Sequence, residues 1–296
     1  MIKTLKIKIV GFVLSPLKVA SLLASVLLCF FFLFHGSKML LGDGSELLMY
    51  LNIYSKEPIS NITIFQEIAM RCVGILLGIT SVTFFLSFLL IEPINQKREL
   101  KLMKWAVFIS MSAMSIYGGL IRGISNQQGA ANIFYFTMLL YILYLSLEKL
   151  SQYRTPAILS NLKLLPIYLT FAYTMGLPGW AKIVTYDKVI NKYQGMFAGS
   201  FVDALPGGVP LMIMLLGLLE SLVPLLLVIS IFKGEFSSSK EKPWLKFALI
   251  TTCLTFMMLC FGLTILFNFP GSSNLVYYFI FTLLVIASLA NSSSEA

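Results

Sequence analysis

One acidic side chain stands out in this sequence because the residues around it are otherwise suited to lipid. Glu220 follows the run Leu215–Leu219 and lies about twelve residues into the apolar stretch 208–232, near mid-depth of a bilayer at about 1.5 Å per residue. A charge at the bilayer centre costs at least about 2.5–3.5 kcal/mol on insertion scales. A carboxyl there needs a cationic partner or takes up a proton. Glu220 is therefore either a functional group or a group that fixes packing by hydrogen bonding across a helix bundle.

The predicted partner of Glu220 is Lys182. It lies at the outer end of the preceding apolar stretch, in the same half of the chain. An opposite charge within reach keeps a buried carboxyl ionised.

Five other polar residues lie at the ends of apolar stretches. Glu67 and Arg71 are four residues apart, so we expect them to pair on one helix face near the headgroups. Arg122 is expected to extend its charged end toward the membrane surface. His35 is the only histidine and is followed by Lys38 where the first stretch ends, which is compatible with a structural group or with a proton relay.

Several kinds of site are excluded by the residue types. A single histidine cannot supply two haem ligands, and the sequence has no zinc or iron–sulfur ligand set. The four cysteines lie in apolar runs without a CxxC motif. No glycine-rich phosphate loop is present. The chain alone is therefore predicted to be neither a haem cytochrome nor an ATPase, and no catalytic or metal site is predicted.

The composition indicates an integral membrane protein. Hydrophobic residues make up 58% of the chain and charged residues 12%, against about 25% charged in soluble domains. Eight apolar runs are long enough to span about 30 Å of hydrocarbon. The first follows the basic segment 1–18 and lacks a signal-peptide cleavage site. The predicted runs are 19–34, 66–91, 104–123, 131–149, 161–178, 208–232, 244–267 and 273–290.

The distribution of basic residues predicts the orientation. Of the 22 Lys and Arg residues, fifteen fall in the segments that would be inside if the N-terminus is inside, and seven fall outside. The positive-inside rule then places both termini in the cytoplasm. The net charge of +9 is thus explained by orientation in the bilayer, and no nucleic-acid partner is predicted.

A turn motif occurs twice, and its two copies keep a nearly constant distance along the sequence. One copy is Gly119-Leu120, Asn126, Gly129, Asn132 and Tyr135, and the other is Gly262-Leu263, Asn268, Gly271, Asn274 and Tyr277. Together with the apolar runs, this predicts two parallel four-helix units, 1–150 and 151–296. The fold class is therefore an all-α membrane protein with eight spans.

Each predicted unit has one long outer loop with an amphipathic stretch. In 45–56 the apolar face is Leu47, Tyr50, Leu51 and Tyr54, and in 179–199 it is Tyr186, Ile190, Tyr193 and Phe197. Such stretches form helices that lie in the membrane interface or pack over the bundle as surface helices. Both interpretations remain open.

The second half resembles DoxX-like membrane proteins over about 161–290. Gly179-Trp180-Ala181-Lys182 is similar to the G-x-x-K motif that ends the first helix of that family. The run Leu215–Ser221 is similar to its second helix with a glutamate. In the first half, the corresponding glycine and lysine are Gly36 and Lys38. They are one residue closer together than in the G-x-x-K motif. Aligning Leu76-Leu77-Gly78 with Leu215-Leu216-Gly217 puts Thr80 or Ser81 at the place of Glu220, so the first unit is expected to lack the carboxyl.

The resemblance implies a bacterial inner-membrane protein. The family includes DoxX, DoxD (a subunit of a thiosulfate:quinone oxidoreductase), a methylamine-utilisation accessory protein and the surfeit-locus cargo receptors. We therefore expect a non-catalytic or redox-associated subunit that contacts the bilayer and other membrane subunits. Its polar pair would line an outward-opening cavity for a quinone or another lipid-like ligand. The alternatives are a proton-coupled small-solute transporter and an interaction protein whose outer loops, 41–65 and 179–207, dock a partner.

Overall fold

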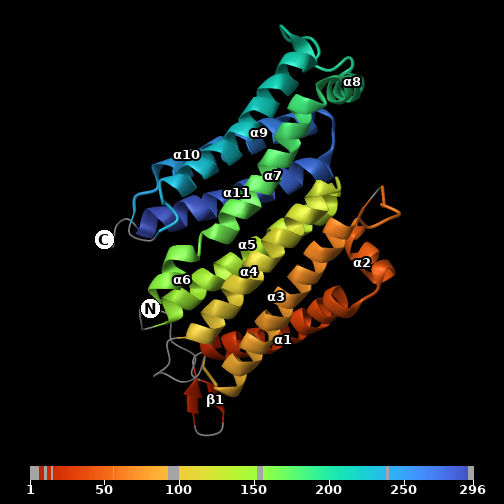
Figure 1. Cartoon of the computed structure of the whole chain (residues 1–296). Coiled ribbons are helices and arrows are strands. Elements are labelled where there is room, and N and C mark those ends of the chain that lie inside the picture. Colours follow the sequence, from red (N-terminus) through yellow and green to blue (C-terminus); the bar gives the residue numbers. More distant parts are fainter. Residues whose placement is uncertain are drawn as a thin grey trace. The chain divides into compact units, whose positions relative to one another are not determined.

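The protein is dominated by long helices in its computed structural model (Figure 1). The structure describes residues 7–9, 12–14, 16–55, 57–92, 100–151, 156–237 and 240–292. The tails before Ile7 and after Ser292, which the sequence places in the cytoplasm, lie outside the described residues. In order the elements are β1 (Ile7–Ile9), β2 (Phe12–Leu14), α1 (Pro16–Leu41), α2 (Gly44–Leu51), α3 (Ile64–Leu89), α4 (Lys101–Gly123), α5 (Gln127–Leu150), α6 (Ala157–Leu162), α7 (Leu165–Val184), α8 (Tyr186–Phe197), α9 (Gly208–Phe232), α10 (Pro243–Ile265) and α11 (Phe269–Ser292). The strands β1 and β2 pair as an antiparallel hairpin.

Seven of the described helices are long and apolar enough to cross a membrane, which supports an integral membrane protein. They are α1 from Lys18 onward, α3, α4, α5, α9, α10 and α11 up to Ala290. The predicted eighth span, 161–178, corresponds in part to α7, which is a 20-residue helix but is not among the seven. Its tyrosines, threonines, prolines and Lys182 lower its hydropathy. The prediction of eight spans is therefore not confirmed.

The chain divides into two compact units, Met1–Pro166 and Ile167–Ala296. The short helix α6 belongs to the first unit. In the first unit α1 packs on α3, α3 on α4 and α4 on α5. In the second unit α10 packs on both α9 and α11, and α8 packs on α9.

Apart from α6, the helices of the two units follow the same order: one long, one short and three long. The last three helices have 26, 23 and 24 residues in the first unit and 25, 23 and 24 in the second. We define the step as the number of residues from the end of a helix in the first unit to the end of the corresponding helix in the second. This step is constant to within one residue. The matched ends are Leu41 and Val184, Leu89 and Phe232, Gly123 and Ile265, and Leu150 and Ser292. The helices of the two units thus agree closely in order and in where they end.

A buried glutamate joins α3 to α4 in the first unit. Glu92 accepts hydrogen bonds from the backbone N–H groups of Leu102 (3.0 Å) and Met103 (3.0 Å) and from the Ser87 hydroxyl (2.8 Å). The first N–H groups of a helix have no partner within it, and a carboxylate there also faces the positive end of the helix dipole. Glu92 therefore fixes where α3 stops and α4 starts.

The second unit has the same arrangement at the same place. Glu235 accepts from the backbone N–H groups of Trp244 (3.2 Å) and Leu245 (2.9 Å) and from the Ser230 hydroxyl (2.7 Å). The step from Glu92 to Glu235 equals the step between the ends of α3 and α9. These two glutamates were not predicted from the sequence, although the Ser-x₄-Glu spacing occurs at both places and was a usable signal.

The predicted repeated turn caps α5 and α11. The Asn126 side chain accepts from Gly129 N (3.0 Å), and Asn268 accepts from Gly271 N (3.1 Å). Asn126 is buried and its amide also donates to the carbonyls of Leu51 (3.0 Å) and Ile53 (2.7 Å). It therefore also anchors the C-terminal end of α2.

Asn126→Ala is expected to destabilise the protein by about 1 kcal/mol more than Asn268→Ala. Both changes remove an N-cap, which costs about 0.5–2 kcal/mol. The change at Asn126 also leaves two carbonyls without their donor, and each net hydrogen bond contributes about 0.5–1.5 kcal/mol. Denaturant titrations in mixed micelles measure both variants. Equal losses would show that the bonds from Asn126 to α2 add nothing.

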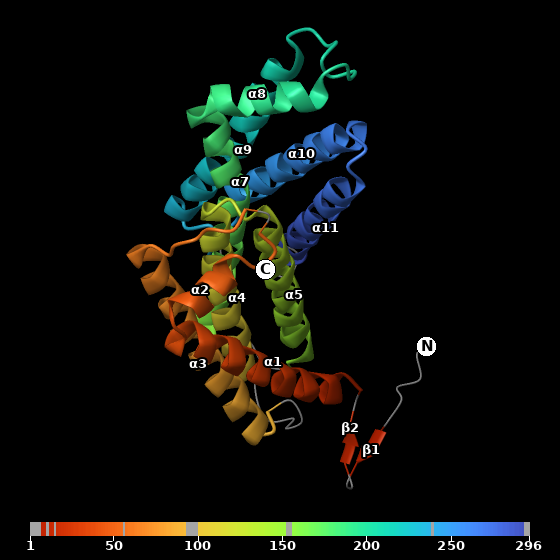
Figure 2. The same ribbon diagram turned by 90° about the vertical axis from the view of Figure 1, so that its right-hand side faces the viewer.

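The amphipathic helix α8 packs on its own unit. The four predicted apolar residues Tyr186, Ile190, Tyr193 and Phe197 belong to one hydrophobic cluster with α9 residues Val209, Ile213 and Leu216. In Figures 1 and 2, α8 crosses the end of α9 at a steep angle. The packed surface helix, one of the two open interpretations, thus describes α8.

The helix α2 packs in the same way, with one exception to the prediction. Leu47, Tyr50 and Leu51 are buried. Tyr54 lies beyond the end of the helix, has a φ of 59° and is exposed. It was therefore wrongly assigned to the apolar face, because the helix stops at Leu51, before the periodic pattern ends.

Candidate functional site

Lys182 of α7 and Glu220 of α9 form a buried ion pair. The Lys182 Nζ lies 2.5 Å from the Glu220 Oε2, and the two side chains are 8% and 3% exposed. Taking both charges out of water costs several kcal/mol per ion, which their attraction only balances when the geometry is good. The structure thus brings together the two residues that the sequence predicts as partners.

Two glycines allow the helices that carry the pair to approach closely. A Cβ added to Gly179 would lie 2.7 Å from the backbone N of Ser221 and 2.8 Å from the Glu220 Cβ. A Cβ added to Gly217 would lie 3.1 Å from the Lys182 Cβ. Small residues at such crossings let backbones come together. The pair therefore forms at a tight crossing of α7 and α9.

The ion pair joins the middle of one helix to the last turn of another. Glu220 lies at the middle of α9, but Lys182 is only two residues from the end of α7 at Val184. On α9, Glu220 lies one helical turn beyond Leu216, and Leu216 belongs to the cluster that α8 covers. The pair is thus level with the last turn of α7 and one turn beneath the apolar cover formed by α8.

Two prolines interrupt the helices beside the pair. Pro178 lies inside α7 and Pro224 inside α9. Proline has no N–H, so Pro224 cannot donate the helical bond to the carbonyl of Glu220, four residues earlier. Pro224 also faces Gly176, where an added Cβ would lie 3.3 Å from its ring. The backbone at Glu220 is therefore less constrained than in a regular helix.

The first unit makes the same helix crossing without charges. A Cβ on Gly74 would lie 2.8 Å from the backbone N of Leu40, and a Cβ on Gly36 would lie 3.0 Å from the Leu77 Cβ. The step from Gly36 to Gly179 equals the step from Gly74 to Gly217. In this register Met39 and Leu77 occupy the positions of Lys182 and Glu220, and they are 2% and 0% exposed.

This register differs from the sequence alignment of the first unit. Lys38 does not occupy the Lys182 position but pairs with Glu46 of α2, and these side chains are 45% and 36% exposed. Thr80 and Ser81 donate to the carbonyls of Leu76 and Cys29. The alignment on Leu-Leu-Gly was four residues out of step because apolar helices offer many similar triplets.

Three of the remaining predicted residues, His35, Glu67 and Arg71, form contacts within the first unit. His35 Nδ1 lies 2.9 Å from the Tyr50 hydroxyl and so joins α1 to α2. Arg71 pairs with Glu67 at 2.7 Å and also donates to the Leu40 carbonyl at 2.6 Å. Arg71 thus caps the C-terminal end of α1.

Arg122 lies in the last turn of α4. None of the four residues His35, Glu67, Arg71 and Arg122 shares a unit with the Lys182–Glu220 pair. Among the described residues, no three His, Cys, Asp or Glu side chains come together in a way that would hold a metal ion.

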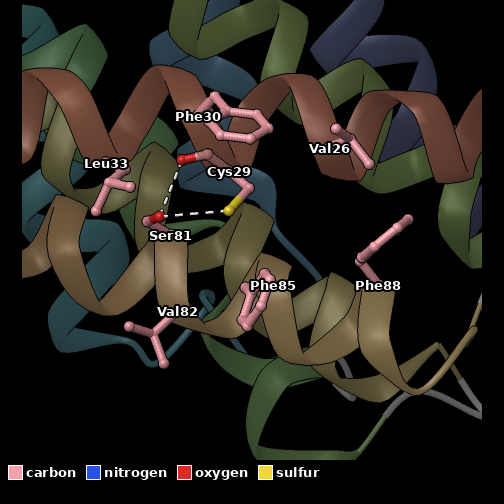
Figure 3. A pocket seen from close by; sticks show the side chains of 8 residues that line it. All are labelled: Val26, Cys29, Phe30, Leu33, Ser81, Val82, Phe85 and Phe88. Carbon is pink, nitrogen blue, oxygen red and sulfur yellow. Dashed lines mark hydrogen bonds between the residues drawn. The ribbon is translucent and has the colours of Figure 1, made fainter.

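A cavity of about 330 Å³ lies between α1 and α3 (Figure 3). It is lined by Val26, Cys29, Phe30, Leu33, Ser81, Val82, Phe85 and Phe88. The Ser81 hydroxyl donates to the Cys29 carbonyl (2.9 Å) and lies 3.5 Å from the Cys29 sulfur. Its polar groups are thus bonded to each other, and the cavity suits an apolar occupant. It belongs to the first unit, so it is not the cavity expected beside Glu220.

Comparison of the chain with protein-family models, with curated proteins and with solved structures gives no match.

Proposed function

We propose that this chain is a duplicated membrane-embedded binding protein of the DoxX-like type, whose second unit carries the ligand site. In this proposal the Lys182–Glu220 pair is the polar anchor of that site. The first unit keeps the same packing but no charged anchor. The protein lies in a bacterial inner membrane with both termini in the cytoplasm.

The duplication is supported by agreements that packing alone does not require. Corresponding helices end at matched positions, and each unit has a buried glutamate, an asparagine cap and a glycine crossing. The step from the first copy of each feature to the second is the same to within one residue. Any one of these agreements has a local cause, such as the need to cap a helix. Their common step is accounted for by descent from one four-helix unit.

The ion pair is the observation that carries the functional proposal. Buried ion pairs can often be replaced by apolar residues of similar volume at no cost, or with a gain of about 1–4 kcal/mol. The first unit makes the replacement itself, with Met39 and Leu77 at the same crossing. Because the fold does not need the charges, we infer that Lys182 and Glu220 are kept for binding.

The ligand class follows from the groups at the crossing. Lys182 supplies a hydrogen-bond donor and Glu220 an acceptor. The Ser221 hydroxyl beside them is buried and has no hydrogen-bond partner among the described residues. A lipid-like molecule with a carbonyl head, such as a quinone, would match these groups. The chain would then act as a non-catalytic or redox-associated subunit, with electron transfer carried out by a partner.

The test compares the amount of quinone bound to the purified protein with the amount bound to the variant Lys182→Met/Glu220→Leu. This variant has the residue types that the first unit has at Met39 and Leu77. We expect at least about a ten-fold loss of bound quinone, equivalent to about 1.4 kcal/mol, in a variant that stays folded. Organic extraction and chromatography measure the quinone.

The matched control is Lys38→Met/Glu46→Leu, which removes the ion pair at the outer end of the first unit and should retain the quinone. Equal quinone in the Lys182→Met/Glu220→Leu protein would contradict the proposed site. A different result would favour the alternative of a proton-coupled small-solute transporter. In that case proteoliposomes would take up a solute when a pH gradient is applied, and the Glu220→Gln variant would lose this uptake.

A further inference from the structure

The turn between α9 and α10 carries a concentration of lysines. Lys233, Lys240, Lys242 and Lys246 fall within a short segment that joins two membrane-spanning candidates. Lys233 and Lys240 are exposed. This basic turn, defined by these four described lysines, takes no part in the Lys182–Glu220 site.

Two of the ammonium groups are held in place by the turn itself. Lys240 Nζ donates to the Lys233 carbonyl at 3.1 Å, and Lys242 Nζ donates to the carbonyls of Lys240 (2.7 Å) and Ser237 (3.0 Å). An ammonium has three N–H donors, so the Lys240 Nζ, which makes one of these bonds, keeps donors for another acceptor. Because the side chains are already ordered, an anion that binds them loses less of its binding energy to side-chain ordering.

The acidic residues of this segment do not cancel its charge. The Glu235 carboxylate is buried and bound to the first turn of α10. Glu241 is exposed. Four lysines against two glutamates leave a surplus of two positive charges. The turn therefore attracts an anion.

Aromatic side chains place the turn at the membrane surface. Phe232 ends α9 and is 87% exposed, and Trp244 lies in the first turn of α10 and is 38% exposed. Tryptophan is enriched where hydrocarbon meets headgroups. The lysines next to these residues thus lie at the depth of lipid phosphates, and basic residues there are attracted to anionic lipids.

We propose that the basic turn binds the headgroup phosphate of an anionic phospholipid, with Lys233 and Lys240 as donors and Lys242 adding positive charge. The charge, the prepared ammonium groups and the flanking aromatics all fit this ligand. A lysine cluster that served only to close the turn would satisfy carbonyls but would not distinguish one lipid from another. The proposal is independent of the ligand of the Lys182–Glu220 pair.

The test uses Trp244 as a reporter in full-length protein. The changes Trp105→Phe and Trp180→Phe leave it as the only tryptophan, since the chain has three. Its quenching is measured in vesicles with brominated phosphatidylglycerol or brominated phosphatidylcholine at equal fractions. We expect phosphatidylglycerol to be preferred by about five-fold per participating lysine at low salt, and the preference to fall as salt rises.

The variant Lys240→Gln/Lys242→Gln should lose most of this preference. The matched control Lys188→Gln/Lys192→Gln changes two exposed lysines of α8 and should keep it. Equal quenching by the two lipids before any lysine is changed would overturn the proposal, and so would an unchanged preference in Lys240→Gln/Lys242→Gln. Competition by inorganic phosphate beyond that of sodium chloride at the same ionic strength would also overturn it, because the site would then recognise a free anion.

Discussion

Glu220→Ala is expected to destabilise the second unit by about 3–5 kcal/mol, because it leaves the Lys182 ammonium buried without its counter-charge. The Lys182 and Glu220 side chains are almost inaccessible, so water cannot easily replace the lost partner. The double variant Lys182→Met/Glu220→Leu removes both charges and imports the pair of the first unit. It is expected to regain most of the loss or to exceed the original stability.

Denaturant titration in mixed micelles gives the free energy of unfolding of each variant. The difference between Glu220→Ala and the double variant shows whether the two substitutions are non-additive. The Lys38–Glu46 pair provides the contrast, since its side chains are 45% and 36% exposed. Exposed pairs contribute about 0–1 kcal/mol, so Glu46→Ala should have little effect. A double variant as unstable as Glu220→Ala would mean that the crossing of α7 and α9 does need the charges. Lys182 and Glu220 would then be structural and not kept for binding.

Much of the helical organisation was predictable from hydropathy. The run 208–232 coincides with α9, and the runs 104–123 and 244–267 differ by three residues or fewer from α4 and α10. Apolar runs are informative because a lipid-facing helix must be apolar over its whole length. The same signal weakened at α7, whose tyrosines, threonines, prolines and Lys182 lower its hydropathy.

The pairing of Lys182 with Glu220 was also predictable, because two charges in apolar stretches of one unit have few alternatives. The register of the first unit was not. Once the charges are replaced by Met39 and Leu77, nothing in the apolar run marks the position, and only the crossing of Gly36 with Gly74 identifies it. Glu92 was overlooked for a different reason. It lies after the end of an apolar run, where a glutamate is normally a solvated loop residue, whereas here it caps α4.

The glycine crossing of the first unit gives the second large effect. Gly74→Ala is expected to destabilise the protein by about 1–3 kcal/mol, the usual cost of overpacking. The added Cβ would lie 2.8 Å from Leu40 N and 3.0 Å from the Gly36 carbonyl oxygen. These are backbone atoms, which cannot move aside by changing a rotamer. The helices α1 and α3 would therefore have to separate.

Gly78 is the matched control, one turn further along α3, and nothing lies within 4 Å of a Cβ built there. Gly78→Ala should be neutral or stabilise α3 by up to about 0.5–1 kcal/mol, because alanine is the better helix former. Denaturant titration of both variants in mixed micelles tests this opposite pair of effects. Equal changes would show that α1 and α3 do not depend on close contact at Gly74. If the two units descend from one ancestor, Gly179→Ala should reproduce the loss in the second unit, since its added Cβ would lie 2.7 Å from Ser221 N. A loss at Gly74 with none at Gly179 would separate the two crossings and weaken the register that pairs Met39 with Lys182.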